Sequence, residues 1–109
     1  MLPNAAQAIV EPTKVRDYLL SIAHPVGRFK AVVFAALGYS SENWQLLAAD
    51  LLALARTEPA HEGQSSSFGQ KYEVSGKLTG PNGRSATFKT VWLLKPDETS
   101  PRFITAFPG

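Results

Sequence analysis

Cysteine is absent from the 109 residues of this chain, and histidine occurs only twice. Disulfide bonds and thiolate metal sites are therefore excluded. The two histidines do not form an HxxxH spacing, and the nine Asp and Glu residues are scattered without the spacing of a metal-binding loop. We therefore expect neither a bound metal nor a cofactor.

Long apolar runs are also missing. No stretch approaches the ~18 continuous apolar residues that a membrane-spanning helix needs. The first twelve residues lack the basic region and apolar segment of a secretory signal. Neither a phosphate-binding glycine-rich loop nor a GxSxG nucleophile motif is present. The chain begins with methionine and shows no delivery domain, so we expect a stand-alone cytoplasmic protein without membrane association.

The composition indicates one globular domain covering residues 1–109. Hydrophobic residues make up 44% of the chain and charged residues 18%, a balance that excludes an intrinsically disordered protein. The 11 Lys and Arg residues exceed the 9 Asp and Glu residues, for a net charge of +2. This mild excess is compatible with an anionic partner but does not require one.

The N-terminal half begins with a segment, residues 6–10, that predicts a short strand or an extended arm. The first helix should then start at Glu11 or Thr13, because both residue types are suited to the N-terminal end of a helix. We expect it to end at about residue 21. Its apolar side consists of Val15, Leu19 and Ile22.

Two more helices are predicted before the pattern changes. One spans about residues 26–37 and is followed by Gly38, a residue type that commonly follows a helix end. The next begins at Ser40 or Ser41 and has an apolar face that consists of Trp44, Leu47, Leu51 and Leu54. The polar residues 57–69 contain proline, glycine and a run of serines, which predicts a mobile loop.

Beyond the loop the apolar residues recur with a period of two, which is typical of strands. We predict strands at about 71–78, 84–95 and 102–107. The sequence GPNG at 80–83 is a strong turn signal that joins the first two into a hairpin. The sequence therefore predicts an α+β fold, in which about three N-terminal helices pack on a C-terminal antiparallel β-meander.

Apolar side chains fall on both faces of the predicted strand 84–95. Phe88 and Trp92 lie on one face, and Val91 and Leu93 lie on the other. An antiparallel sheet that is covered on one side usually has one polar face. Either the second face forms a groove or partner surface, or the N-terminal segment or the loop at 57–69 covers it, and the sequence leaves both alternatives open.

Lys30 is the first candidate for chemistry, because it interrupts the apolar side of the second predicted helix. That side consists of Val26, Phe29, Val33, Phe34 and Leu37. A lysine there either extends its ammonium group past the edge of the core into water or directs it at an anion in a cleft between helix and sheet.

His24 is the second candidate, since it precedes Pro25 and should lie at the N-terminus of the same helix. An imidazole there can act as a general acid or base near neutral pH, and the free N–H groups of the helix start can bind an anion. The alternative is an ordinary capping residue. His61 falls in the predicted loop and is a weaker candidate.

Further candidates lie mostly on the predicted strands. We assign Thr90, Arg102 and Thr105 to catalysis alongside His24 and Lys30. Threonine is common in strands for reasons of propensity alone, and Trp92 is either a core residue or a stacking surface for a base. The residues assigned to substrate binding are Arg28, Lys71, Tyr72 and Trp92.

Three segments of the chain resemble a known family. They are DYLLSIAHPVGRFKAVVFAALGY at 17–39, GQKYEVSGKLTGPNGRSATFKTVWLL at 69–94 and PRFITAFP at 101–108. These segments resemble a small bacterial domain family of unknown function. That family is in turn similar to the C-terminal toxin domains of polymorphic and contact-dependent inhibition proteins.

The resemblance implies a barnase–EndoU–colicin–RelE-like fold, in which helices precede a curved antiparallel sheet that bears the active site. It also implies a metal-independent ribonuclease. The matching positions in this sequence are His24, Lys30, Thr90, Arg102 and Thr105.

Two functions follow as hypotheses. In a ribonuclease, His24 would take the proton from a ribose 2′-hydroxyl as this group attacks the adjacent phosphate. Lys30 and Arg102 would stabilise the charge that develops on the phosphate, and the two threonines would orient it. The alternative is a non-catalytic interaction protein that binds a cognate antitoxin or immunity-like protein, or a second copy of itself, through the sheet face or edge.

Overall fold

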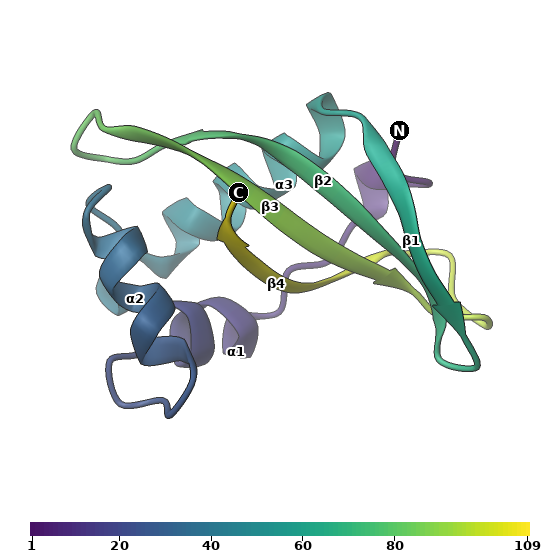
Figure 1. Cartoon of the computed structure of the whole chain (residues 1–109), viewed down its shortest axis with the longest axis horizontal. Coiled ribbons are helices and arrows are strands. Elements are labelled where there is room, and N and C mark those ends of the chain that lie inside the picture. Colours follow the sequence, from purple (N-terminus) through teal and green to yellow (C-terminus); the bar gives the residue numbers. More distant parts are fainter.

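Four antiparallel strands form one sheet in the order β1-β2-β3-β4 (Figure 1). The computed structural model describes all 109 residues. The helical elements are η1 (Ala5–Gln7), α1 (Pro12–Lys14), η2 (Val15–Leu19), α2 (Gly27–Ala35), η3 (Ser41–Asn43) and α3 (Trp44–Thr57). The strands are β1 (Ala60–Ser66), β2 (Gly69–Thr79), β3 (Ser85–Leu94) and β4 (Arg102–Pro108). The predicted α+β architecture is confirmed.

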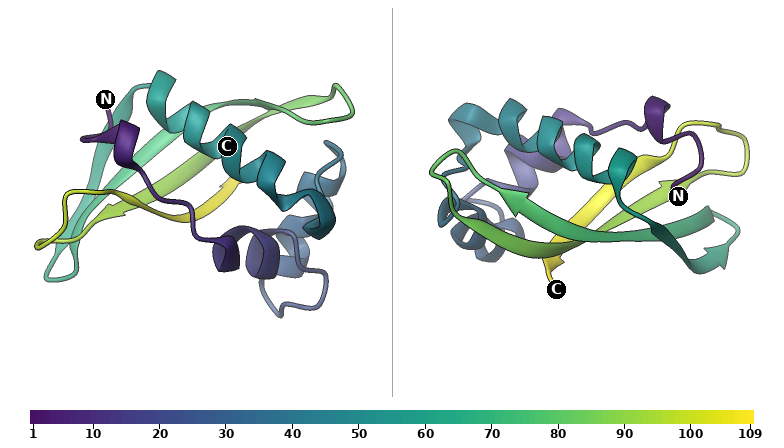
Figure 2. Two further views of the ribbon diagram at one scale, coloured as in Figure 1. Left: turned by 180° about the vertical axis from the view of Figure 1, so that it is seen from behind. Right: turned by 90° about the horizontal axis from the view of Figure 1, so that it is seen from above.

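The helices lie on one face of the sheet, and Figure 2 shows this layering from above. The core between the layers contains the large side chains of Phe34, Phe88, Trp92 and Phe103, all almost fully buried. Phe34 on α2 stacks on Phe88 on β3 with ring centroids 4.8 Å apart. This contact joins the helical layer to the middle of the sheet. None of the helices has the length and apolarity that crossing a membrane requires.

Strand β1 occupies much of the segment that was predicted to be a mobile loop, so that prediction is wrong there. Its residues pair with β2 from Ala60 opposite Val74 to Ser66 opposite Gly69. All of β1 after Ala60 is exposed, so the strand has no apolar alternation for a sequence pattern to detect. Its conformation comes from backbone hydrogen bonds to β2.

The first helix is α1 continued by η2, and it buries Val15 and Leu19 as predicted. Ile22 lies beyond its end and is 83% exposed, so its assignment to the buried side is wrong. Of the two alternatives for residues 6–10, a short strand or an extended arm, the strand does not form: η1 ends at Gln7, and the extended residues after it make a single parallel bridge between Ile9 and Arg102.

Helix α2 is shorter than predicted and buries only part of the predicted side, since Phe34 and Leu37 are buried as expected. Gly27, Ala31 and Phe34 are its buried residues, whereas Val26 is 54% exposed and Phe29 is 66% exposed. A Cβ atom at position 27 would lie 1.8 Å from the carbonyl oxygen of Tyr18. Because η2 and α2 meet at this small residue, Val26 and Phe29 beside it turn outward.

The outer face of the sheet is uncovered, which answers the question that the sequence left open. The N-terminal segment stays at the edge of β4, where Ile9 exchanges backbone hydrogen bonds with Pro101 and Phe103. The segment that forms β1 extends the sheet rather than folding over it. Val91 and Leu93 on β3 therefore remain partly exposed on the outer face.

Candidate active site

A cleft of about 600 Å³ opens between the first helix, the turn before α2 and the end strand β4. The N-terminal stretch from the first helix to the turn before α2 therefore meets the distant strand β4 around one space. The cleft is lined by Thr13, Lys14, Asp17, Tyr18, His24, Val26, Ile104 and Thr105. It brings together two predicted site residues, His24 and Thr105, and a third, Lys30, contacts Thr105 from α2.

Lys30 crosses from α2 to the edge of β4. Its Nζ donates hydrogen bonds to Thr105 Oγ1 at 2.8 Å and to the carbonyl oxygen of Ala106 at 3.0 Å. Both acceptors are uncharged, and Lys30 takes part in none of the four ion pairs of the molecule. The partly buried ammonium group therefore points toward the sheet with its charge uncompensated. Its two hydrogen bonds hold the ammonium group against β4, so Lys30 does not extend freely into water.

Tyr18 completes this group, and sequence reasoning missed it. Its Oη lies 3.3 Å from Thr105 Oγ1, the atom that also accepts from Lys30. The Lys30 Nζ atom lies 5.7 Å from the centre of the Tyr18 ring. The signal in the sequence was spacing, since Tyr18 follows the buried Val15 by three residues and so shares its face of the helix.

His24 caps α2. Its Nδ1 atom accepts hydrogen bonds from the backbone N–H groups of Val26 at 3.0 Å and Gly27 at 2.9 Å. An imidazole that accepts at Nδ1 carries its proton on Nε2 when it is neutral. In this geometry His24 is a hydrogen-bond donor at Nε2 and not an acceptor there. Its ring packs edge-on against Tyr18, with centroids 5.0 Å apart.

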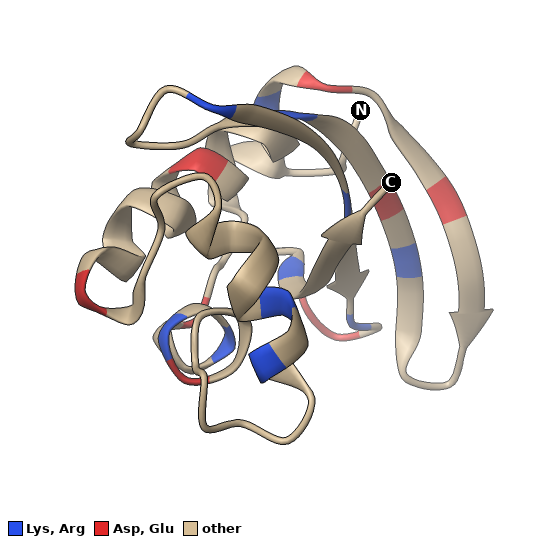
Figure 3. Cartoon of the chain, turned by 60° about the vertical axis from the view of Figure 1, so that its left-hand side comes forward, with Lys and Arg blue, Asp and Glu red and all other residues tan.

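The charge around the cleft is predominantly positive. The segment from Tyr18 to Ser41 contains no Asp or Glu, and α2 carries two basic positions without an acidic one (Figure 3). The one carboxylate that lines the cleft, Asp17, accepts two hydrogen bonds of 2.9 Å from Arg16. These bonds hold the pKa of Asp17 below its usual value, so its charge is already paired.

Arg102 lies apart from this group. Its guanidinium binds Glu98 through two hydrogen bonds of 2.9 and 3.0 Å and Glu11 through one of 2.9 Å. The two carboxylates raise the pKa of Arg102, and the guanidinium of Arg102 holds the pKa of Glu98 below its usual range. The Arg102 side chain is therefore ion-paired with two carboxylates, and it does not line the cleft.

Thr90 and Trp92 are fully buried. Thr90 Oγ1 donates to the carbonyl oxygen of Val74 at 2.7 Å and accepts from Trp92 Nε1 at 2.8 Å. Neither side chain can contact a substrate in the folded protein. This corrects the assignment of Thr90 to catalysis and of Trp92 to substrate binding. The hydrogen bonds instead satisfy the polar atoms of both side chains inside the core.

The remaining substrate-binding candidates are dispersed. Arg28 is exposed on α2, where its guanidinium lies 4.9 Å from the centre of the Phe29 ring. Lys71 is exposed on β2 and lines a hollow of about 440 Å³ on the outer face. Tyr72 is partly buried and packs against the core. None of the three lines the cleft at His24.

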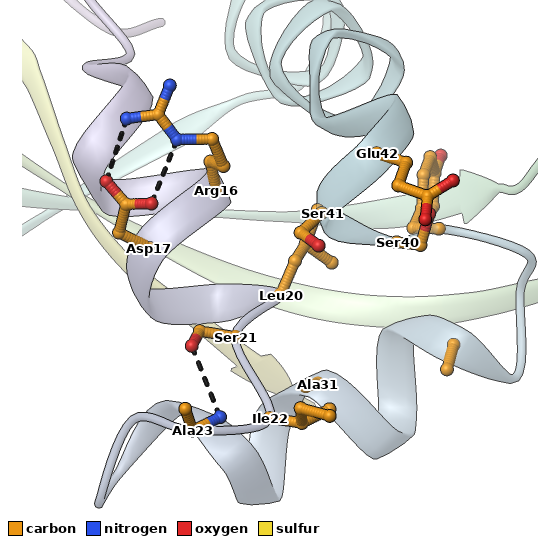
Figure 4. A pocket seen from close by; sticks show the side chains of 12 residues that line it. Arg16, Asp17, Leu20, Ser21, Ile22, Ala23, Ala31, Ser40, Ser41 and Glu42 are labelled. Carbon is orange, nitrogen blue, oxygen red and sulfur yellow. Dashed lines mark hydrogen bonds and ion pairs between the residues drawn. The ribbon is translucent and has the colours of Figure 1, made fainter.

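A second cavity, of about 570 Å³, lies on the other side of the first helix (Figure 4). Its floor is apolar, with Leu20 and Ala31, and the Arg16–Asp17 pair lies at its rim. Tyr39 also lines it, but its hydroxyl donates to Asp50; burial and this carboxylate raise the pKa of Tyr39. Glu42 also lines the cavity and forms no ion pair, but it is exposed to solvent. The cavity thus offers no unpaired titratable group that is partly buried as Lys30 is. Nowhere in the molecule do three His, Asp or Glu side chains gather in a way that could hold a metal ion.

The fold defines a class of small α+β domain that is found among solved structures. A chain of the contact-dependent growth inhibition toxin–immunity protein complex from Klebsiella pneumoniae 342 is similar, with a TM-score of 0.71 and 19% sequence identity over 95% of each chain. At this identity the likeness shows a shared fold. The chain itself belongs to the family described as a domain of unknown function (DUF6883), which matches residues 1–109. No curated protein matches the chain.

Proposed function

We propose that this protein is a toxin-like domain that binds RNA at the His24–Lys30 cleft and cleaves it without a metal ion. One observation carries the proposal. Lys30 holds an uncompensated ammonium group against Thr105 and Tyr18, beside a cleft lined by His24. A phosphodiester would supply the missing negative charge and would accept hydrogen bonds from all of these groups.

The shared fold supports the proposal. The similar solved chain comes from a complex of a growth inhibition toxin with its immunity protein. The resemblance of the sequence to toxin domains, and the barnase–EndoU–colicin–RelE-like fold that it implies, belong to the same proposal. So does a location in the bacterial cytoplasm, where the substrate RNA is found.

The reaction is transesterification within the RNA strand. The ribose 2′-oxygen forms a bond to the adjacent phosphorus as its proton passes to a water molecule. The bond from phosphorus to the 5′-oxygen breaks, and water returns a proton to this leaving oxygen. The products are a 2′,3′-cyclic phosphate and a free 5′-hydroxyl. Lys30 stabilises the additional charge on the phosphorane oxygens. His24 donates from Nε2 to the same phosphate, because its capped Nδ1 leaves no free acceptor for the general-base role that the sequence suggested.

The experiment is an RNA cleavage assay in EDTA, in which purified protein is incubated with total bacterial RNA and the products are separated on a gel. We expect discrete cleavage, which falls by about 10²-fold or more in Lys30→Met because a donor to the developing charge is lost. Lys77→Met is the matched control, since Lys77 is exposed on β2 and does not line the cleft. Circular dichroism verifies that both variants fold.

Cleavage that Lys30→Met leaves unchanged, or no cleavage at micromolar protein, would contradict the ribonuclease proposal. The second candidate function is then binding of a cognate immunity- or antitoxin-type protein or of a second copy. The exposed apolar side chains Ile22, Phe29 and Val32 favour it, because they are 83%, 66% and 69% exposed in the single chain.

A further inference from the structure

Phe107 follows Ala106, whose carbonyl oxygen accepts a hydrogen bond from Lys30. It is on β4 directly opposite Lys89 on β3, and its ring is partly buried. The Nζ atom of Lys30 lies 5.4 Å from the centre of this ring, and the Nζ atom of Lys89 lies 5.9 Å from it. One aromatic ring is thus within 5.9 Å of the ammonium groups of both Lys30 on α2 and Lys89 on β3.

The charge of Lys89 is only weakly compensated. Its one ionic partner is Glu73 on β2, at 3.7 Å, and the two side chains are 37% and 45% exposed. An exposed pair at this distance contributes little and is easily displaced by a better anion. Lys30 has no ionic partner. Two cations therefore flank Phe107 with one loosely held carboxylate beside them.

We propose that Phe107 and Lys89 form a second subsite for single-stranded RNA, an inference that rests on the proposed function of the cleft. Lys30 binds the phosphate at the cleft, Lys89 binds a neighbouring phosphate, and the intervening base contacts the Phe107 ring. A lysine beside a partly exposed aromatic ring on a sheet is the combination that binds single strands without reading their sequence.

The spacing fits a short piece of RNA. Because both Nζ atoms lie within 5.9 Å of the same ring centre, their separation is at most twice that distance, which one or two nucleotides of an extended strand can span. The protein should therefore bind a strand of several nucleotides better than a dinucleotide. Glu73 competes with the second phosphate for Lys89.

Binding is measured by fluorescence anisotropy in EDTA with fluorescein-labelled 2′-O-methyl oligouridylates of two and five nucleotides. The 2′-O-methyl group blocks cleavage, so the result is independent of catalysis. We expect the pentamer to bind wild-type protein about tenfold or more tightly than the dimer. Lys89→Gln and Phe107→Leu should each reduce this preference to about threefold or less, while Glu73→Gln should increase it.

Lys95→Gln is the matched control, because it removes the same charge from an exposed position about 20 Å further along the direction of β3. Equal weakening by Lys89→Gln and Lys95→Gln, equal affinity for both oligomers, or no binding of either would overturn the subsite. Cleavage of total RNA without the length preference overturns only this inference. Length-dependent binding without cleavage overturns only the ribonuclease proposal.

Discussion

Lys30 and His24 show how much a single residue depends on its partners. Both were recognisable from the sequence, Lys30 because it interrupts an apolar stripe and His24 because it precedes a helix. Their roles were not recognisable. Thr105, which accepts a hydrogen bond from Lys30, is 75 residues away in the sequence. The backbone N–H groups that donate to His24 Nδ1 can be identified only from the folded conformation of the turn.

The role of His24 leads to a prediction at the residue scale. Asparagine can also cap a helix with its side-chain oxygen and offer an N–H donor, so His24→Asn should keep about a tenth or more of the cleavage activity if His24 acts as a donor. His24→Ala should lose about 10²-fold or more. Initial rates of cleavage of a labelled oligoribonucleotide measure both. Equal, nearly complete loss in the two variants would instead indicate a general base.

Helix α2 is the element whose orientation creates the site. Its sequence pattern correctly predicted that Phe34 is buried, but the close approach at Gly27 buries Gly27 and Ala31 in place of Val26 and Phe29. In this orientation of the helix, Lys30 reaches β4. A periodic pattern of apolar residues shows that a helix is amphipathic, but two small residues can define the contact when the neighbouring helix comes this close.

Gly27→Ala tests the close approach. The added Cβ atom would lie 1.8 Å from the Tyr18 carbonyl oxygen, so η2 and α2 must move apart. We expect a loss of about 1–3 kcal/mol in the free energy of unfolding, which outweighs the helix propensity that alanine gains over glycine, at most about 1 kcal/mol. Urea denaturation measures it.

Gly63→Ala is the control, because a Cβ atom there meets its nearest atom at an ordinary 3.5 Å. We expect its stability to stay within about 0.5 kcal/mol of wild type. If Gly27→Ala were equally harmless, the account of the α2 orientation would be incorrect.

Across the whole molecule, Arg102 joins parts that are distant in the sequence. It connects Glu11 before α1 and Glu98 before β4 to the end strand, and Ile9 pairs with the same strand. The residue is better understood as a link between the N-terminal segment and the sheet than as part of the cleft. The same link keeps the first helix beside β4, where the cleft forms.

This link should make stability depend on pH. Arg102 lowers the pKa of Glu98 in the folded protein, so the stabilisation is present above the unfolded pKa of about 4.3 and is lost as the pH falls through the lower folded value. Glu98→Gln should therefore unfold at a lower temperature than wild type at about pH 7, with a difference that shrinks toward about pH 2.

Thermal unfolding followed by circular dichroism across this pH range measures the difference. Glu42→Gln is the control, since Glu42 is exposed and forms no ion pair. A Glu98→Gln deficit that stays constant down to about pH 2 would mean that the ion pair is not its cause.

The sequence by itself determined the α+β class, the hairpin at 80–83 and the placement of Phe88 and Trp92 on the same face of one strand. These features depend on local conformation and on side chains that alternate along one strand. Only the tertiary structure decided that polar β1 joins the sheet, that Phe29 faces solvent, and that Lys30 meets Thr105. These features all depend on contacts between segments that are distant in the sequence. They are the pairing of strands, the contact between two helices and the partner of a partly buried charge. A pattern of residues along the chain does not show which distant segments come into contact.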